Sequence, residues 1–206
     1  MSINTGLHTE DKHLVKKVLQ GDHHAFGIII QNTEKLVARI VFDIVTNDEE
    51  RKDLVQEIYL KVYQKLSAFK FQSKLSTWIG QISYNSCIDH IRKKKNVLYG
   101  LHGLKNDDDC GDGYEAVLQK QSGKVTEHAD ALVTRKARTE IINKGMQKLS
   151  PVYRSMITLY HNEELSYEEI GQITGMPPGT VKSYLFRARK ELKNILLAEY
   201  KKEELW

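Results

Sequence analysis

The segment "GMPPGTVKSYLFRARKEL" (residues 175–192) joins strong turn signals to a basic, periodic stretch. A glycine and two prolines end one helix, and the apolar spacing that follows predicts another. Together with "SYEEIGQIT" (166–174), the segment predicts two helices about a short turn.

Two closely crossing helices need a small residue on the first helix, a flexible turn and apolar residues that fix the second helix. The residues that meet these needs are Gly171, Gly175, Val181 and Leu185, with Ile170 and Ile173 on the inner face. We expect Thr180, after Gly179, to cap the second helix.

The second helix carries a basic outer face. Its outward positions hold Lys182, Ser183, Phe186, Arg187 and Lys190. Hydrogen-bond donors and one aromatic side chain suit the major groove of DNA, with its phosphates and base edges. A solvated charged helix is the alternative for a charge run alone, but the turn, the small residues and the expected cap in register favour DNA contact.

The composition predicts a soluble protein of one or two domains. The chain has 206 residues, 40% of them hydrophobic, and a net charge of +4, which is too mild to indicate nucleic-acid binding by itself. No apolar run reaches a membrane span, and the polar N-terminus lacks the apolar centre of a secretory signal, so we expect a cytoplasmic protein. Cys87 and Cys110 are predicted to be free thiols, and no pattern of metal ligands, cofactor motif or catalytic cluster is complete.

Helical spacing extends through the N-terminal half. Helices are expected at 11–20, at about 25–46, along the apolar tracks that run from Leu54 to Leu66, and at about 77–95, the last capped by Ser76. Glycines and acidic residues then predict a flexible acidic linker. Periodicity returns near Ala129, and Ser150 before Pro151 predicts another helix start. The expected fold is all-α, with helical domains at 1–96 and 129–206 joined by a linker at 97–128.

Two polar tracks lie outside the predicted N-terminal core. The first holds Asp53, Gln56, Glu57 and Gln64, and by itself it is typical of an ordinary solvated helix face. The second holds Trp78, Gln81, Asn85, Asp89 and Arg92, followed by a basic run. An aromatic ring, an amide and cations suit single-stranded nucleic acid, although Trp78 alone is also compatible with a buried core position.

Three segments in this order resemble bacterial RNA polymerase sigma factors of the small extracytoplasmic-function type. They are "DLVQEIYLKVYQKL", "STWIGQISYNSCIDHIRKKK" and "LSYEEIGQITGMPPGTVKSYLFRARKEL". The resemblance implies a subunit without covalent chemistry, with core RNA polymerase, duplex and single-stranded promoter DNA and an anti-sigma factor as partners.

The resemblance also implies a role for individual residues. The polymerase-binding positions are Asp53, Gln56 and Glu57. The positions that bind the minus-ten element are Phe69, Trp78, Asn85, Asp89, Arg92 and Lys93, with residues 69–76 as the base-binding loop. The positions that bind the minus-thirty-five element are Thr180, Lys182, Ser183, Phe186, Arg187, Arg189 and Lys190.

Three positions depart from the family pattern. Phe71 stands where many members have glycine, Gly171 where alanine is more usual, and Tyr184 where a basic residue is frequent. Loss of the glycine predicts a changed loop backbone. A stand-alone helix-turn-helix regulator is the alternative function, but it would have no need for the segment 47–95. A DNA-processing enzyme such as a recombinase lacks an assigned cluster of catalytic side chains.

Overall fold

The computed structural model describes residues 4–100 and 135–200, with side chains described for residues 10–94 and 139–200. The chain divides into two compact units, one of Met1–Leu104 with Leu165–Pro178 and the other of Lys105–Glu164 with Gly179–Trp206. The described residues are almost entirely helical and contain no strand, which confirms the predicted all-α fold.

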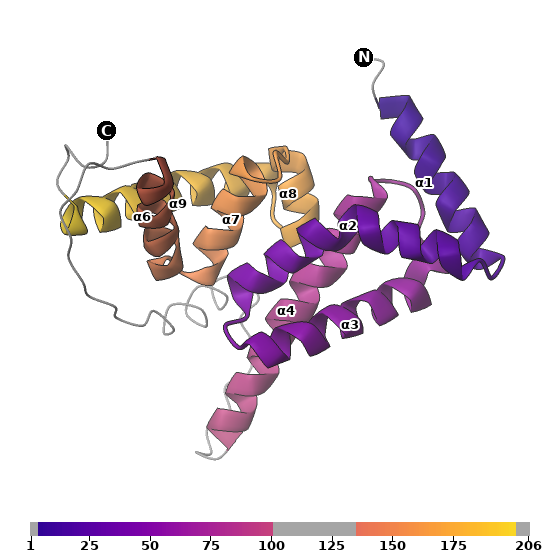
Figure 1. Ribbon diagram of the computed structural model, residues 1–206, viewed down its shortest axis with the longest axis horizontal. Coiled ribbons are helices and arrows are strands. Elements are labelled where there is room, and N and C mark those ends of the chain that lie inside the picture. The colour runs from indigo at the N-terminus through magenta and orange to yellow at the C-terminus, as the bar shows by residue number, and fades with distance from the viewer. Residues whose placement is uncertain (1–3, 101–134, 201–206) are drawn as a thin grey trace. The chain divides into compact units, whose positions relative to one another are not determined.

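Figure 1 shows the helices of both units. The first unit contains α1 (Asn4–Leu19), α2 (His23–Ile44), α3 (Asp48–Lys65), the short 3-10 helix η1 (Leu66–Ala68), α4 (Leu75–Gly100) and α8 (Tyr167–Thr174). The second unit contains α6 (Arg135–Lys148), α7 (Pro151–His161) and all but the first residue of α9 (Pro178–Glu199). None of the described helices combines the length and the apolarity that a membrane crossing requires.

Local sequence explains several helix starts, because a side-chain oxygen accepts from backbone N–H groups that have no partner inside the helix. Asp22 accepts from the Ala25 N–H at 3.1 Å, and this contact holds the Asp22 pKa below its ordinary value. Ser150 caps α7 as predicted, with Pro151 in the first turn. Ser166 forms a reciprocal capping box with Glu169 at the start of α8.

The core of the first unit lies between α2, α3 and α4 (Figure 1). Its fully buried side chains include Ile29, Ile40, Ile58, Val62 and Ile79. The three helices bury these side chains because the apolar residues of each helix recur on one face.

Helix α8 also packs against α4. Ile170 and Ile173 of α8 are completely buried. A Cβ atom at Gly80 of α4 would lie only 3.0 Å from Cδ1 of Ile173, so the missing side chain at Gly80 allows this approach. Lys74 and Glu169 form an ion pair of 2.8 Å beside the contact.

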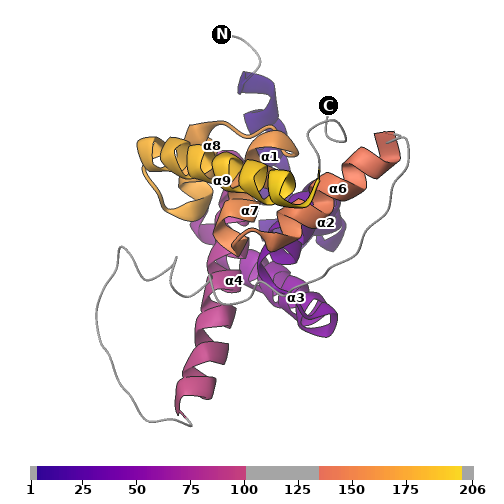
Figure 2. The same cartoon turned by 90° about the vertical axis from the view of Figure 1, so that its left-hand side faces the viewer.

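The second unit packs α6 and α7 against α9. Figure 2 shows α6 beside the C-terminal half of α9, where Gly145 lies against Leu192 and Leu196. The Arg154 guanidinium donates hydrogen bonds of 2.9, 2.7 and 3.1 Å to three carbonyl oxygens at the end of α6 and just beyond it. A cation at this end satisfies carbonyl groups that a helix terminus leaves without partners.

Two predicted caps are wrong. Helix α9 begins at Pro178, so Thr180 lies within its first turn, because proline at a first helical position already has a suitable φ. Helix α4 begins at Leu75, so Ser76 also lies inside the helix. The acceptor at the start of α4 comes instead from Asp11 of α1, whose Oδ2 lies 3.1 Å from the Leu75 nitrogen.

Helix α4 continues to Gly100, five residues beyond its expected end and into the predicted linker. Residues 101–128 of that linker, with Cys110, lie outside the described residues. Cys87 is a free thiol, as predicted, and its burial raises the pKa to about 12. A buried thiol with this pKa stays protonated and unreactive at neutral pH.

Candidate nucleic-acid interface

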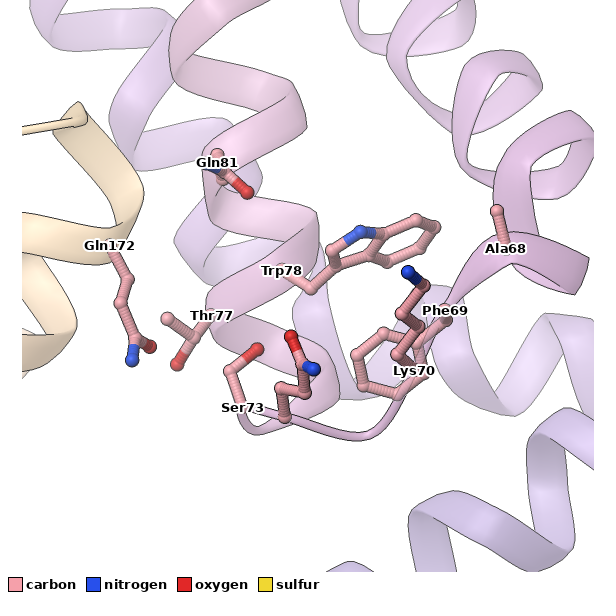
Figure 3. A pocket seen from close by; sticks show the side chains of 9 residues that line it. Ala68, Phe69, Lys70, Ser73, Thr77, Trp78, Gln81 and Gln172 are labelled. Atoms are coloured by element: carbon pink, nitrogen blue, oxygen red, sulfur yellow. The ribbon is translucent and has the colours of Figure 1, made fainter.

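A pocket of about 330 Å³ opens in the first unit beside the loop that joins η1 to α4. It is lined by Ala68, Phe69, Lys70, Gln72, Ser73, Thr77, Trp78, Gln81 and Gln172. Figure 3 shows Trp78 next to Phe69, with Thr77 and Gln172 farther along the wall. The pocket combines aromatic side chains with several polar ones, so it offers a planar polar group both a stacking surface and hydrogen-bond partners.

Three aromatic rings support one wall of the pocket. Phe69 is 7% exposed, and its ring centroid lies 4.7 Å from that of Phe71 and 5.1 Å from that of Trp78. Trp78 is only partly buried and lines the pocket, so it is available to a stacking partner. Phe69, in contrast, supports Trp78 from within.

The loop backbone is left-handed at Phe71, where φ is +56°. This is the region that glycine enters without cost, whereas another residue loses about 1–2 kcal/mol there. The Phe71 ring packs against Phe69, and Lys12 Nζ lies 5.8 Å from its centroid. The loop thus has a glycine-like backbone conformation without a glycine.

Polar groups of the pocket include several that sequence reasoning did not single out. Gln72 and Ser73 come from the loop, while Gln172 comes from α8, far away in the chain. Thr77 lines the pocket, and its buried Oγ1 has no hydrogen-bond partner among the described residues. Buried polar atoms are seldom left unpaired, and exceptions often occur at functional sites. Gln81 already belongs to the polar track predicted from the sequence. Of the other residues, only Thr77, four positions before Gln81 on the same helix, had a spacing that could have indicated it.

The predicted polar track of α4 continues from the pocket toward the C-terminal end of the helix. Asn85, Asp89, Arg92 and Lys93 are all exposed. Asp89 and Arg92 lie 4.0 Å apart as a loose ion pair on one face. The structure therefore places four of the six predicted minus-ten residues on the open surface, Trp78 at the pocket and Phe69 beneath it.

His90 and Lys94 on the same helix have a different environment. Glu50 of α3 contacts His90 Nε2 at 3.0 Å and Lys94 Nζ at 2.6 Å. Hydrogen bonds from Lys94 and His90 hold the Glu50 pKa below its ordinary value. These contacts join the start of α3 to α4.

Helix α9 separates an apolar face from a basic one. Val181, Leu185 and Ala188 are buried, whereas the predicted outward residues are exposed. The exposed set is Lys182, Ser183, Phe186, Arg187, Arg189 and Lys190, while Thr180 is partly buried. Such a face can contact phosphates and base edges.

Local contacts orient two arginines of α9. Tyr184 packs edge-on against Tyr153 at 5.9 Å, and the Arg187 guanidinium lies 5.6 Å from the Tyr184 ring. Arg189 is held more firmly, because its Nε donates to His161 Nε2 at 3.3 Å and its guanidinium lies 5.0 Å from the Tyr160 ring. The unusual tyrosine at position 184 thus supports Arg187 and packs within its own unit.

The predicted polymerase-binding track lies on the open side of α3. Asp53, Gln56 and Glu57 are exposed, and Glu57 pairs with Lys61 at 2.7 Å. The hydrogen bond from Lys61 lowers the Glu57 pKa. Leu60, one turn farther, is 57% exposed, since it lies off the buried stripe of Leu54, Ile58 and Val62. The track is therefore a polar face with one exposed leucine, which suits a protein partner.

Two family profiles match the chain. The family described as Sigma-70 region 2 matches residues 29–97, which include the pocket loop and α4 from its start at Leu75 to residue 97. The family described as Sigma-70, region 4 matches residues 139–192, which include α7, α8 and the basic face of α9.

Curated proteins match nearly the whole chain. The ECF RNA polymerase sigma factor SigW of Bacillus subtilis is 32% identical over 191 residues, covering 90% of this chain and 96% of that protein. The ECF RNA polymerase sigma-E factor of Escherichia coli K12 is 31% identical over 186 residues, covering 89% and 93% respectively.

Two solved structures share the fold. The structure of CnrH in complex with the cytosolic domain of CnrY gives a TM-score of 0.61 at 19% identity, covering 93% of this chain and 99% of that chain. The sigma factor RpoE of Bartonella quintana, in complex with the anti-sigma factor NepR, gives a TM-score of 0.60 at 21% identity, covering 85% and 98%.

Proposed function

Because the chain belongs to the extracytoplasmic-function group of the sigma-70 family, we propose that it binds core RNA polymerase in the cytoplasm and directs initiation at specific promoters. The observation that carries the proposal is the coincidence of the matched regions with two chemically suitable surfaces. The aromatic pocket lies within the region 2 match, apart from Gln172, and the basic face of α9 lies within the region 4 match.

The pocket suits a base flipped out of the minus-ten element. Trp78 would stack on the base, and the amides of Gln72, Gln81 and Gln172 could hydrogen-bond its edge. Asn85, Arg92 and Lys93 would then follow the separated non-template strand along α4, with Asp89 beside them. Phe69 contributes by fixing the Trp78 ring.

Helix α9 suits the duplex of the minus-thirty-five element. Lys182, Ser183, Phe186 and Arg187 would face the base edges, while Thr180, Arg189 and Lys190 would contact phosphates. The proposed functional domains are 1–96 and 129–206, joined by a linker at 97–128. By sequence α8 belongs to the second of these domains, although it packs against α4 within the first compact unit. Connection of the two raises the effective concentration of the second contact once the first has formed, so neither needs to be tight alone.

The exposed track of α3 is the proposed polymerase surface. Asp53, Gln56 and Glu57 supply its polar groups, and Leu60 adds an apolar contact. The structural neighbour RpoE is described in complex with the anti-sigma factor NepR. We extend this to an anti-sigma factor for the present chain, which would hold it inactive by covering the same surface.

Run-off transcription with purified core polymerase tests the proposal. Templates come from start sites mapped after overexpression of the chain, and we expect transcripts only when both chain and core are present. Trp78→Ala and Arg187→Ala should each reduce initiation at least tenfold, whereas Gln31→Ala, at an exposed site of α2, should not change it. Binding to a defined operator without any initiation would favour the stand-alone regulator instead.

A further inference from the structure

We infer that α1 is a positioning element for the base pocket, acting through the adjacent residues Asp11 and Lys12. The inference rests on the proposed function of the pocket, since it concerns how that site is held in shape. Residues Asn4–Leu19 form α1, which precedes the region 2 match at residues 29–97. Asp11 and Lys12 of α1 therefore lie outside the segment that the region 2 match covers.

The first contact fixes the start of α4. Asp11 Oδ2 accepts a hydrogen bond of 3.1 Å from the Leu75 N–H, across 64 positions in sequence. Leu75 opens α4, and the position before it is Lys74, whose side chain carries no acceptor. Asp11 thus supplies from another helix both the missing acceptor and a negative charge at the positive end of the α4 dipole.

The second contact fixes the loop itself. Lys12 Nζ lies 5.8 Å from the centroid of the Phe71 ring, within the range of a cation–π interaction. Phe71 has the left-handed backbone conformation, and its ring packs against Phe69, which in turn contacts Trp78. A contact that retains the Phe71 ring therefore helps to retain the unfavourable backbone angle and the aromatic wall of the pocket.

The two contacts hold the loop at two places. Gln72 and Ser73 lie between Phe71 and Leu75, and both line the pocket. Helix α1 can act as a firm support because it packs on α2, where Val15 and Val18 are buried one and two turns beyond Asp11. Release of either contact leaves α4 folded but allows the intervening loop residues to move. Selectivity for the bound base depends on their placement, since a displacement of about 1 Å is enough to lose a directional hydrogen bond.

The test compares Asp11→Ala with Asp11→Asn and with a matched control. Asparagine retains a side-chain acceptor, so Asp11→Asn should behave as the wild type does. Asp22→Ala is the control, because Asp22 also caps a helix of the first unit through one hydrogen bond of 3.1 Å and lies outside the pocket lining. Both alanine variants should lower the Tm by a similar amount.

Holoenzyme made with core polymerase is titrated with single-stranded non-template oligonucleotides that carry each of the four bases at each minus-ten position mapped for the wild type. The base ratio is the affinity for the oligonucleotide with the best base at the flipped position divided by the affinity for the one with the worst base. For Asp11→Ala we expect this base ratio to fall about fivefold, a factor equivalent to about 1 kcal/mol. Asp22→Ala should retain the wild-type ratio. Equal ratios for the two alanine variants would refute a positioning role for Asp11.

Lys12→Met provides a second variant that does not endanger folding, because Lys12 is exposed. We expect a reduced base ratio with an unchanged salt dependence of binding. A salt slope lowered by about one with an unchanged ratio would assign Lys12 to a phosphate contact instead and overturn its proposed role. A wild-type holoenzyme that binds no single-stranded non-template DNA would refute the proposed function and, with it, the role of α1.

Discussion

Gly171→Ala is expected to destabilise the first unit, although alanine normally strengthens a helix. A Cβ atom at position 171 would lie 2.6 Å from the carbonyl oxygen of Met176, a backbone atom of the turn after α8. To reach ordinary contact the turn must move by about 0.8 Å. Overpacking of this kind costs about 1–3 kcal/mol, against a gain of about 0.5–1 kcal/mol in helix propensity. The expected net loss therefore lies between about 0 and 2.5 kcal/mol, with a midpoint of about 1 kcal/mol.

Gly27→Ala is the matched control, because a Cβ atom at this position in α2 would have no neighbour within 4 Å. Here only the propensity gain of about 0.5–1 kcal/mol applies. Thermal unfolding by circular dichroism should show opposite shifts, at about 2–4 °C per kcal/mol for a chain of this size. A rise in Tm for Gly171→Ala equal to that for Gly27→Ala would show that the close approach of the turn does not limit position 171.

Three further predictions concern single contacts. Glu50→Gln should flatten the dependence of the unfolding free energy on pH below about pH 4.5. The folded-state pKa of Glu50 is lowered, so this group contributes stability that is present above its ordinary pKa of 4.5 and is lost as the pH falls through the folded value. An acid titration of the unfolding free energy measures this effect, and an unchanged slope would count against it. Phe71→Gly should be more stable than Phe71→Ala by about 1 kcal/mol in urea unfolding. Both variants lose the ring, but only glycine removes the strain of the left-handed backbone conformation. The reverse order of stability would exclude strain at this position. Arg154→Lys should lower the free energy of unfolding by about 1–2 kcal/mol, since an ammonium cannot reach the three carbonyl oxygens that the guanidinium contacts. An unchanged Tm would show that those hydrogen bonds contribute little.

The sequence predicted the helices well because their cores repeat at helical spacing. Ile58 and Val62 of α3 and Val181 and Leu185 of α9 all occupy the buried positions that periodicity assigned to them. Gly175 was correctly expected to be the flexible turn residue and has φ of +75°. The exposure of the two predicted polar faces on α3 and α9 follows from the same periodicity, since a side opposite a buried stripe faces solvent.

Contacts between distant segments could not be predicted in this way. Ser76 and Thr180 were reasonable caps by local chemistry, but α4 obtains its acceptor from Asp11, and α9 begins earlier, at Pro178. The same limit applies to Gln172, which reaches the pocket from α8. Local rules predict what a residue can do for its own helix, and they contain no term for a partner supplied by another.

The sequence by itself determined that this chain is helical, which faces of its helices are apolar, and which family it resembles. Periodicity and turn chemistry act over a few residues, so they can be recognised without the fold. Only the tertiary structure decided that Phe69 supports Trp78, that Phe71 adopts a left-handed backbone without a glycine, and that Asp11 and Lys12 hold the pocket loop. These features depend on distances between segments that chain folding brings together, and residue order alone does not contain those distances.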